Sequence, residues 1–391
     1  MSAAPDILIV GAGIFGITSA LELRRRGYSV TLLDQGPVPH PLAASKDISK
    51  VVRMEYGEDE LYMEMAEQAM NGFDEWNQTL SRPFYHETGV AMLAMDDMQP
   101  GGFEYDSWQT LWKRGHQPER LRSEEIARRF PAWKTGRFTD GFFHRRGGWV
   151  ESGALVGELI EVCRREGVMI KNDGAASLIV EAGRATGLRT ADGRIMHASQ
   201  ILLACGAWIG TLLPEMDAVI RSTGHPVFHL RPTNPDLFSS PEFVTFTADI
   251  ARTGWYGFPL HPSGKVVKIG RHSDGLPTDP IKGERSIPAS IETELRTFLR
   301  SVLPELADAP VVYTRLCLYA DSIDGDYWID HHPKIEGLTV AVGGSGHGFK
   351  MAPILGALIA DRIDGSNNPW LSRFVWRTPS APKSEAARCS D

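Results

Sequence analysis

Three glycines near the N-terminus have the spacing of a turn that binds a nucleotide. The apolar stretch 6–10 leads into GAGIFG, which places Gly11, Gly13 and Gly16 ahead of a helical pattern. In such a turn the first glycine permits a tight bend and the second lets the backbone approach a pyrophosphate. The third lets the helix pack closely on the strand.

The pattern around this turn is strand, glycine turn, helix over 14–26 and strand over 28–33. Ile14 and Phe15 open the helix, whose N-terminus carries partial positive charge toward bound phosphates. Asp34 ends the unit at the position that binds ribose hydroxyls in such motifs. The pattern predicts a bound dinucleotide, but it does not separate FAD from NAD.

A second glycine-rich turn, GGSGHGFK over 343–350, lies between an apolar strand and a helix. Its glycines let backbone amides reach an anionic or electron-rich ring. The alternative is a helix cap followed by a solvated lysine, although capping needs fewer glycines. The candidates for contact with a ring are Gly344, Gly346, His347, Gly348 and Lys350.

Two basic clusters suit redox chemistry or an anionic substrate. In VVKIGRH, Lys268 and His272 lie four residues apart in a strand and therefore share a face. A lysine there supplies positive charge to a reduced cofactor and its oxygen partner, with Lys265 as a competitor. In DISKVVR, Lys50 and Arg53 follow the nucleotide motif, and the planar arginine fork binds carboxylates. The alternatives are a charged surface strand and a surface helix.

Cys317 lies between apolar residues in RLCLYADSIDGDYWIDHHP. A cysteine in such surroundings is usually an inert core thiol. Its residue type alone therefore indicates no chemistry.

The remaining pattern indicates the elements that position these groups. Helical spacing occurs over 61–80, 123–129 and 289–303, and hairpin turns are expected at 182–183 and 192–193. A buried strand over 200–207 carries Cys205 and Gly206 and is followed by Trp208. We expect an α/β protein with a discontinuous FAD- or NAD-binding domain (1–82, 146–220 and 313–376), a strand-rich substrate-binding domain (83–145 and 221–312) and a flexible tail (377–391).

The composition argues against several classes of protein. The net charge is -8, which lacks the basic footprint of a nucleic-acid binder. Four cysteines without a CxxC pair argue against zinc and a disulfide framework, and His40, His331 and His332 lack metal-ligand spacing. The first residues do not resemble a signal peptide, and no apolar run reaches the roughly 18 residues that cross a membrane. We therefore expect a cytoplasmic protein without a metal.

Taken together, the segments give the chain a family resemblance. GAGIFG, DISKVVR, CGAW, VVKIGRH, the Cys317 segment and SGHGFK, in this order and over nearly the whole chain, resemble the FAD-dependent amine oxidases related to monomeric sarcosine oxidase. That group includes N-methyltryptophan oxidase, pipecolate oxidase and the fructosyl-amino-acid oxidases (amadoriases). The resemblance implies a Rossmann-like FAD-binding domain and a mixed-sheet substrate domain, as in glutathione reductase and D-amino-acid oxidase.

The same resemblance implies roles for individual residues. It implies FAD attached through a thioether to Cys317, with Lys268 at the oxygen-activating lysine. The implied catalytic residues are Lys268, His272, Lys350 and Arg53, and the implied substrate-binding residues are Arg53, Tyr256, His272 and Lys350. The implied cofactor-binding residues are Gly11, Gly13, Ile14, Phe15, Gly16, Asp34, Ser45, Lys50, Cys205, Gly206, Trp208, Cys317, Gly344, Gly346, His347, Gly348 and Lys350.

Lys50 stands where sarcosine oxidase carries an arginine beside the flavin, and this favours the fructosyl-amino-acid branch. We therefore expect oxidation of the C–N bond of an N-substituted amino acid, with dioxygen reduced to hydrogen peroxide. Fructosyl amino acids rank ahead of sarcosine-like N-methyl amino acids and of cyclic imino acids such as pipecolate or proline. Because the family is often monomeric, we also expect a monomer.

Three other hypotheses stay open on the sequence. A flavin dehydrogenase would pass electrons to another protein, and a peroxide assay separates it from an oxidase. A non-catalytic flavin sensor or complex subunit would not bleach with any amine. An NAD-dependent dehydrogenase would not be yellow when purified.

Overall fold

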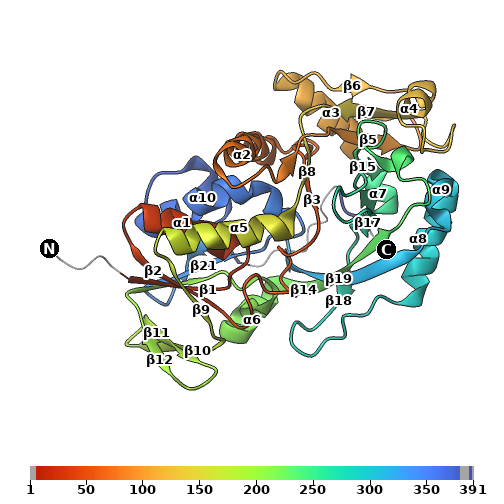
Figure 1. Ribbon diagram of the computed structural model, residues 1–391. Coiled ribbons are helices and arrows are strands. Elements are labelled where there is room, and N and C mark those ends of the chain that lie inside the picture. Colours follow the sequence, from red (N-terminus) through yellow and green to blue (C-terminus); the bar gives the residue numbers. More distant parts are fainter. Residues whose placement is uncertain (1–5, 379–386, 390–391) are drawn as a thin grey trace.

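The computed structural model describes residues 6–378 and 387–389, which form two lobes (Figure 1). The lobe that contains the N-terminal strand is built on a six-stranded sheet in the order β20–β21–β13–β1–β2–β9. Its strands are β1 (Asp6–Val10), β2 (Ser29–Asp34), β9 (Met169–Asn172), β13 (Gln200–Leu203), β20 (Trp328–His331) and β21 (Leu338–Val342). All neighbouring strands are parallel except β20 and β21.

Alternate residues of β1 face two different layers. Ile7 and Ile9 pack among buried side chains of the helical layer, whereas Leu8 and Val10 pack against a small antiparallel sheet and the helix α6. The helical layer consists of α1 (Ile14–Arg25), α2 (Glu60–Thr79), α5 (Ser152–Arg165) and α10 (Ala352–Asp364). The opposite layer consists of β10 (Ala175–Glu181), β11 (Arg184–Thr190), β12 (Ile195–His197) and α6 (Ile209–Leu212). Because both faces are covered, residues 7–10 of β1 are all apolar.

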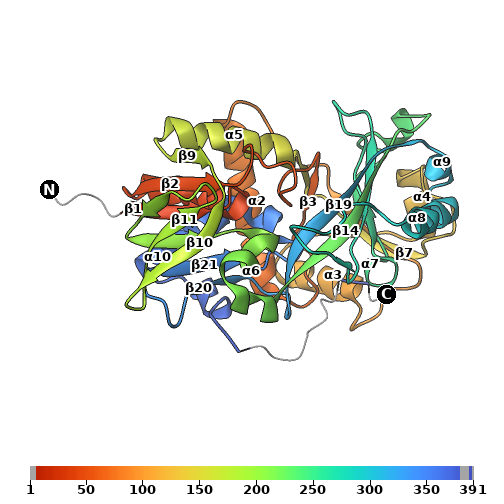
Figure 2. The ribbon, with the colours of Figure 1, turned by 90° about the horizontal axis from the view of Figure 1, so that it is seen from below.

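The second lobe is a large mixed sheet in the order β18–β14–β17–β16–β15–β5–β7–β6, and β19 pairs with β14. Its strands are β5 (Val90–Ala94), β6 (Glu119–Arg120), β7 (Asp140–His144), β14 (Ile220–Leu230), β15 (Thr245–Ala248), β16 (Trp255–Gly257), β17 (Val267–Arg271), β18 (Leu276–Pro277) and β19 (Val311–Ser322). The helix α8 (Ala289–Val302) buries Leu295 and Leu299 in the core of this lobe. Figure 2 shows β14 and β19 running side by side between the lobes.

A three-stranded sheet contributes further residues to the site. It consists of β3 (Lys50–Val52), β8 (Gly148–Val150) and β4 (Tyr85–His86), with β8 in the centre. The shorter helices of the second lobe are α3 (Phe103–Lys113), α4 (Ser123–Arg129), α7 (Ile250–Thr253) and α9 (Pro304–Ala307).

The expected α/β fold class is confirmed by the parallel sheet and by the mixed sheet beside it. The helices predicted over 61–80, 123–129 and 289–303 are α2, α4 and α8. Ala182 and Gly183 both have positive φ, as the predicted hairpin turn requires. The strand predicted over 200–207 is shorter, because β13 ends at Leu203 and residues 206–208 form a 3-10 turn.

Two segments differ from the sequence-based division of the chain. β19 falls mostly in the stretch 313–376 assigned to the nucleotide-binding domain, yet it pairs with β14 of the mixed sheet along its length. Of the tail 377–391 expected to be flexible, residues 379–386 and 390–391 lie outside the described residues. Arg388 pairs with the buried carboxylate of Asp321 at 2.9 Å, and Cys389 is buried beside Ser273, so these residues are held by the folded protein. The remaining domain boundaries stay predictions.

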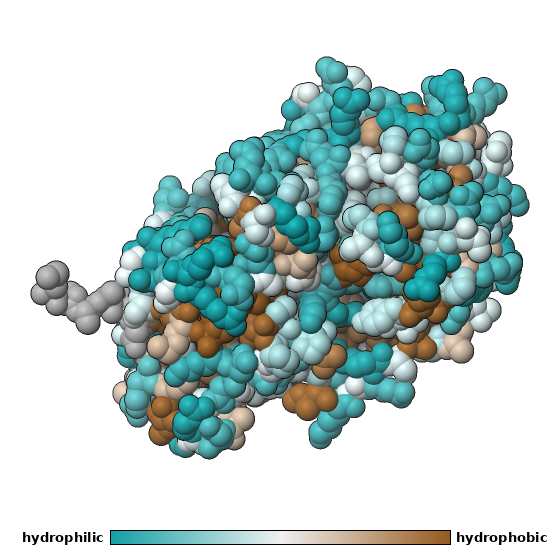
Figure 3. Space-filling model, viewed as in Figure 1, coloured by the Kyte–Doolittle hydropathy of each residue, from teal (hydrophilic) through white to brown (hydrophobic). Residues whose placement is uncertain are grey.

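The face seen in Figure 3 is largely hydrophilic, with scattered small hydrophobic areas, while the apolar side chains fill the cores named above. Within residues 6–378 and 387–389, no helix has the length and apolar character needed to cross a membrane. Over the same residues, no group of three or more His, Cys, Asp or Glu side chains could hold a metal ion.

The contact between α1 and α10 depends on a glycine. A methyl group at Gly356 would lie 2.3 Å from the Thr18 carbonyl oxygen, so Gly356→Ala must push the two helices apart. We expect this change to lower the free energy of unfolding by about 1–3 kcal/mol, as overpacking does. The control is Gly157→Ala in α5, where a methyl group meets open space. This change should raise the free energy of unfolding by about 0.5–1 kcal/mol. Urea unfolding followed by circular dichroism gives both values, and an equal effect of the two changes would contradict the packing argument.

Candidate functional site

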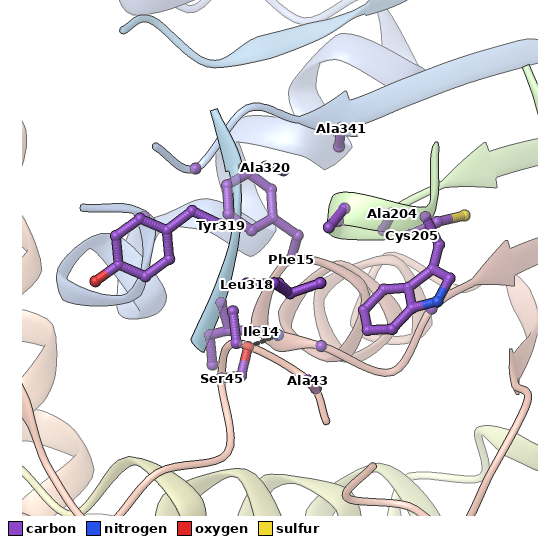
Figure 4. A pocket seen from close by; sticks show the side chains of 18 of the residues that line it. Ile14, Phe15, Ala43, Ser45, Ala204, Cys205, Leu318, Tyr319, Ala320 and Ala341 are labelled. Carbon is purple, nitrogen blue, oxygen red and sulfur yellow. Dashed lines mark hydrogen bonds between the residues drawn. The ribbon is translucent and has the colours of Figure 1, made fainter. Parts of the chain in front are cut away.

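The larger cavity opens where β1, β13 and β21 end. The space between its walls, open solvent included, is about 1200 Å³. The carboxyl ends of parallel strands form the crevice at which α/β folds bind ligands. One side of the cavity is formed by the turn that follows β1 and by the segments that follow β13 and β21. The other side is formed by residues 43–45 and by 318–320 of β19 (Figure 4).

The glycine turn after β1 is shaped for close approach. Gly11 has a φ of 104°, and a methyl group on it would lie 2.4 Å from the Ala204 carbonyl oxygen. Gly16 does not line the cavity; a methyl group there would lie 1.9 Å from the Gly11 carbonyl oxygen. Figure 4 shows Ser45 at the start of α1, where its Oγ accepts a hydrogen bond of 2.9 Å from Ile14 N. Only glycine fits at 11 and 16.

Asp34 lies at the end of β2 and lines this cavity. Its Oδ2 accepts a hydrogen bond of 2.7 Å from Ala12 N, which ties the end of β2 to the glycine turn. A carboxylate in this place can accept hydrogen bonds from ribose hydroxyls. The cavity therefore has the turn, the helix N-terminus and the acceptor that a dinucleotide requires.

A second cavity adjoins the first at four shared residues, which are Lys50, Tyr319, Gly346 and Phe349. Its volume is about 640 Å³. The remaining lining comes from β3, β15, α7, β16, β17 and the turn after β21. Its lining includes Lys50, Arg53, Lys268, His272, His347 and Lys350, and none of the lining residues is Asp or Glu. This wall favours an anionic ligand.

Arg53 is buried in this wall with 7% of its surface exposed. Its guanidinium lies 5.7 Å from the centre of the Tyr56 ring and 5.4 Å from that of Phe103, and it donates to the Glu55 carbonyl oxygen. The Glu55 carboxylate itself pairs with His144 at 2.9 Å. Within the described part of the chain, no carboxylate forms an ion pair with Arg53. A buried guanidinium held between rings is suited to a carboxylate that arrives with a ligand.

Lys268 is also buried and lines the second cavity, whereas Lys265 is exposed in a turn with a φ of 49°. Lys268 Nζ donates a hydrogen bond of 2.7 Å to Asp47 Oδ2 and another to the Ser49 carbonyl oxygen. Burial lowers the pKa of Lys268 to about 8, although the charge of Asp47 opposes this shift. Between the two lysines left open by the sequence, only Lys268 reaches the cavity.

A hydrogen-bonded aromatic cluster supports the turn after β21. His347 Nε2 lies 3.0 Å from the Gly325 carbonyl oxygen, which only accepts, so this nitrogen carries a hydrogen. The hydroxyls of Tyr56 and Tyr327 each lie 3.1 Å from His347 Nδ1, whose single lone pair accepts one of them at a time. Lys350 Nζ lies 4.6 Å from the centre of the Tyr56 ring. The cluster fixes the backbone that carries His347 and Lys350 into the wall.

Two tyrosines stand at the junction of the cavities. Tyr256 and Tyr319 are linked by a side-chain hydrogen bond, and burial is the main cause that raises the pKa of each. Both hydroxyls therefore stay protonated over the physiological range and act as hydrogen-bond donors.

Cys317 is 1% exposed and packs against Val227, Tyr319 and Ala44. It does not line either cavity, although its contacts Ala44 and Tyr319 line the larger one. Cys205 does line the larger cavity, and burial raises its pKa to about 12. A thiol with such a pKa is a poor nucleophile at neutral pH.

The structure brings most of the sequence-predicted residues together. Those that line the larger cavity are Gly11, Gly13, Ile14, Phe15, Asp34, Ser45, Lys50, Cys205, Gly206, Trp208, Gly344, Gly346 and Gly348. Those that line the second cavity are Lys50, Arg53, Tyr256, Lys268, His272, Gly346, His347 and Lys350. Gly16 and Cys317 lie behind the wall of the larger cavity.

The sequence analysis missed several wall residues. Tyr319 stands two residues after Cys317 on the same strand, and this spacing could have found it. Thr247, Ile250 and Phe258 come from the mixed sheet and carry no motif. Asp47 was part of the DISKVVR segment, but nothing in the sequence shows that it contacts Lys268.

Comparison with known proteins agrees with this geometry. A protein-family model described as FAD dependent oxidoreductase matches residues 6–362. L-saccharopine oxidase of Schizosaccharomyces pombe is 29% identical, over 98% of this chain and 95% of the relative. N-methyl-L-tryptophan oxidase of Salmonella arizonae is 28% identical, over 91% of this chain and 94% of the relative. The solved structure of the fructosamine oxidase Amadoriase II of Aspergillus fumigatus in complex with FSA has a TM-score of 0.85 at 28% identity, over 100% of this chain and 94% of that chain.

Proposed function

The chain belongs to the family of FAD-dependent oxidoreductases, and on this premise we propose that it is an oxidase of a secondary amine that carries a carboxylate. The observation that carries the proposal is Arg53, a buried guanidinium in a wall of basic side chains. Glu55 and Glu104 act on it electrostatically, but no carboxylate among the described residues forms an ion pair with it. The names of the relatives above support oxidation of an N-substituted amino acid.

The larger cavity fits FAD. Its glycine turn leaves no room for a side chain at Gly11, and Asp34 offers an acceptor at the end of β2. When bound, FAD supplies the electron acceptor for oxidation of the C–N bond and the electron donor for dioxygen. We assign contact with its redox-active ring to the four residues shared by both cavities, since they join the nucleotide cradle to the basic wall.

The basic wall orients the substrate. Arg53 would bind the carboxylate through two parallel hydrogen bonds, and Lys350 would add a second positive charge beside the same Tyr56 ring. Because like charges and burial disfavour a further cation, the wall also lowers the pKa of the substrate ammonium. The neutral amine, which holds the electron pair needed to release a hydride equivalent, is then favoured without a strong protein base.

Fructosyl amino acids lead among the candidate substrates, with Lys50 and the likeness to Amadoriase II as support. Saccharopine is a second candidate, because the relative that oxidises it covers nearly the whole chain and because several basic side chains could bind several carboxylates. N-methyl amino acids and cyclic imino acids follow. The monomeric state and cytoplasmic location stay predictions.

Anaerobic reduction tests the function. The yellow protein is mixed under nitrogen with fructosyl-glycine, saccharopine, sarcosine, N-methyltryptophan or pipecolate, and the oxidised-flavin band near about 450 nm is followed. Rapid bleaching by one compound, with recovery of the colour and release of hydrogen peroxide in air, is the expected result. If the protein is yellow and none of these amines bleaches it, the proposed function is wrong.

Arg53→Met should weaken substrate binding. Losing a buried, bidentate charge contact costs about 2–5 kcal/mol, so the KM should rise about 30-fold or more while FAD stays bound. The control is Arg128→Met on the exposed face of α4, which should change KM less than about twofold. Steady-state peroxide assays give both values, and a wild-type KM in Arg53→Met would remove the carboxylate assignment.

We also propose that FAD is attached covalently through Cys317. Its contacts Ala44 and Tyr319 line the cofactor cavity, so the sulfur lies directly behind the wall of that cavity. Acid precipitation of wild type should leave the yellow colour in the pellet, whereas Cys317→Ala should release it into the supernatant. Cys205→Ser is the matched control, since Cys205 lines the same cavity, and it should keep the colour in the pellet. Colour retained by Cys317→Ala would place the attachment elsewhere.

A further inference from the structure

Lys268 and Asp47 form a buried ion pair that the proposed reaction does not yet use. Both side chains are almost fully enclosed, at 3% and 2% exposure, and the Nζ–Oδ2 distance is 2.7 Å. The ammonium also donates to the Ser49 carbonyl oxygen and lies 4.7 Å from the centre of the Phe258 ring. The lysine therefore has one fixed position, with Asp47 on one side and the cavity on the other.

Asp47 is itself held firmly. Its carbonyl oxygen accepts hydrogen bonds from Gly153 N at 2.7 Å and from Ser152 Oγ at 2.9 Å, at the start of α5. A methyl group on Gly153 would lie 2.8 Å from this oxygen, so the contact requires a glycine. Its Oδ1 accepts from Ile48 N at 2.7 Å. The first two contacts fix the backbone of Asp47, and a carboxylate that turned away from Lys268 would lose its hydrogen bond from Ile48 N.

The charges around the pair come from several elements. Lys50 Nζ on β3 lies 4.0 Å from Asp47 Oδ2, and His229 Nε2 on β14 lies 3.8 Å from Asp47 Oδ1. Tyr256 on β16 lies within the field of Asp47. Lys50 and Lys268 repel each other, and among these groups Asp47 is the carboxylate whose negative charge offsets that repulsion.

The direction of titration follows from these contacts. Burial lowers the pKa of Lys268 to about 8, and Asp47 is the main group that opposes this shift. Burial would raise the pKa of Asp47, but the charge of Lys268, the neighbouring His229 ring and the charge of Lys50 hold it well below its usual range. Without the carboxylate, the pKa of Lys268 would fall further, since its burial and the charge of Lys50 would lose their main opposition.

We propose that Asp47 is a positioning residue for the oxygen half of the reaction, which keeps Lys268 charged and directed at the cavity. This inference rests on the proposed oxidase function, in which dioxygen takes two electrons and two protons to become hydrogen peroxide. The first electron gives dioxygen a negative charge, and a fixed ammonium stabilises that charge as it develops. Asp47 acts through Lys268 and does not touch oxygen.

Direct titration of Lys268 tests the inference without measuring turnover. The holoenzyme is prepared with lysine carrying ¹³C at Cε, and NMR spectra are recorded from about pH 6 to about pH 10. The signal missing from Lys268→Met is that of Lys268. In Asp47→Asn its pKa should fall by about one unit or more. An unchanged pKa would overturn the proposal.

Oxygen reactivity gives a second readout. Wild type, Asp47→Asn, Lys268→Met and the double variant are reduced with dithionite, mixed with oxygen and followed as the yellow colour returns. At neutral pH, Asp47→Asn should react about tenfold more slowly, and its rate should begin to fall at a lower pH than in wild type. In the Lys268→Met background the Asp47 change should cost less than about twofold. An equal loss in both backgrounds would mean that Asp47 acts independently of the lysine, and would overturn the proposal.

Further variants keep the test decisive. If Asp47→Asn does not fold, Asp47→Ser removes the charge with less bulk and carries the same expectations. Lys268→Arg needs no help to stay protonated, so the Asp47 change in that background should leave the pH profile flat. Because dithionite replaces the amine, failure here is separate from failure of the amine-oxidase proposal, which the anaerobic bleaching decides. A wild-type oxygen rate in Lys268→Met would overturn this inference while leaving amine oxidation in place.

Discussion

The burial of positive charge at the junction of two sheets is the constraint on which the rest of the site depends. Lys50, Arg53, Lys268 and Lys350 reach one cavity, and no carboxylate lines it. Burying unpaired cations is costly, so the protein must hold each of them by other means. Asp47 pairs with Lys268 behind the wall, and Arg53 lies between two aromatic rings and donates to a backbone carbonyl. An anionic ligand would complete the balance.

The architecture explains how these cations come together. β3 and the residue after it bring Lys50 and Arg53, β17 brings Lys268 from the mixed sheet, and the turn after β21 brings Lys350. β19 crosses between the lobes, pairs with β14 and contributes Tyr319 to both cavities. The redox-active end of the cofactor and the substrate would thus meet where elements from both lobes converge.

The two cavities differ in what shapes them, since backbone geometry dominates one and side chains dominate the other. The larger one is shaped mainly by main-chain geometry, with glycines at 11 and 346 that cannot be replaced without a clash. The second one is defined by charged and aromatic side chains, which decide the ligand it can orient. This division is typical of cofactor enzymes, in which the cofactor supplies the reaction and the protein supplies placement and charge.

The nucleotide-binding motif and most of the candidate residues could be predicted from local patterns in the sequence and from the family resemblance. The turn GAGIFG, its flanking strands and Asp34 are local features, because a tight turn and a helix N-terminus are encoded within about 30 residues. The predicted helices are also local, since a spacing of 3.6 residues per turn is visible in any one segment. Lys268 was singled out over Lys265 only through the resemblance, and both remained open on residue pattern alone.

Only the tertiary structure decided which of these residues meet. The pairing of β19 with β14 depends on residues about 90 positions apart in the chain, and no local pattern encodes such long-range pairing. The contact of Asp47 with Lys268 joins residues 221 positions apart. Whether a lysine is a solvated surface charge or a buried cation with one partner is set by what packs around it, and that is a property of the fold.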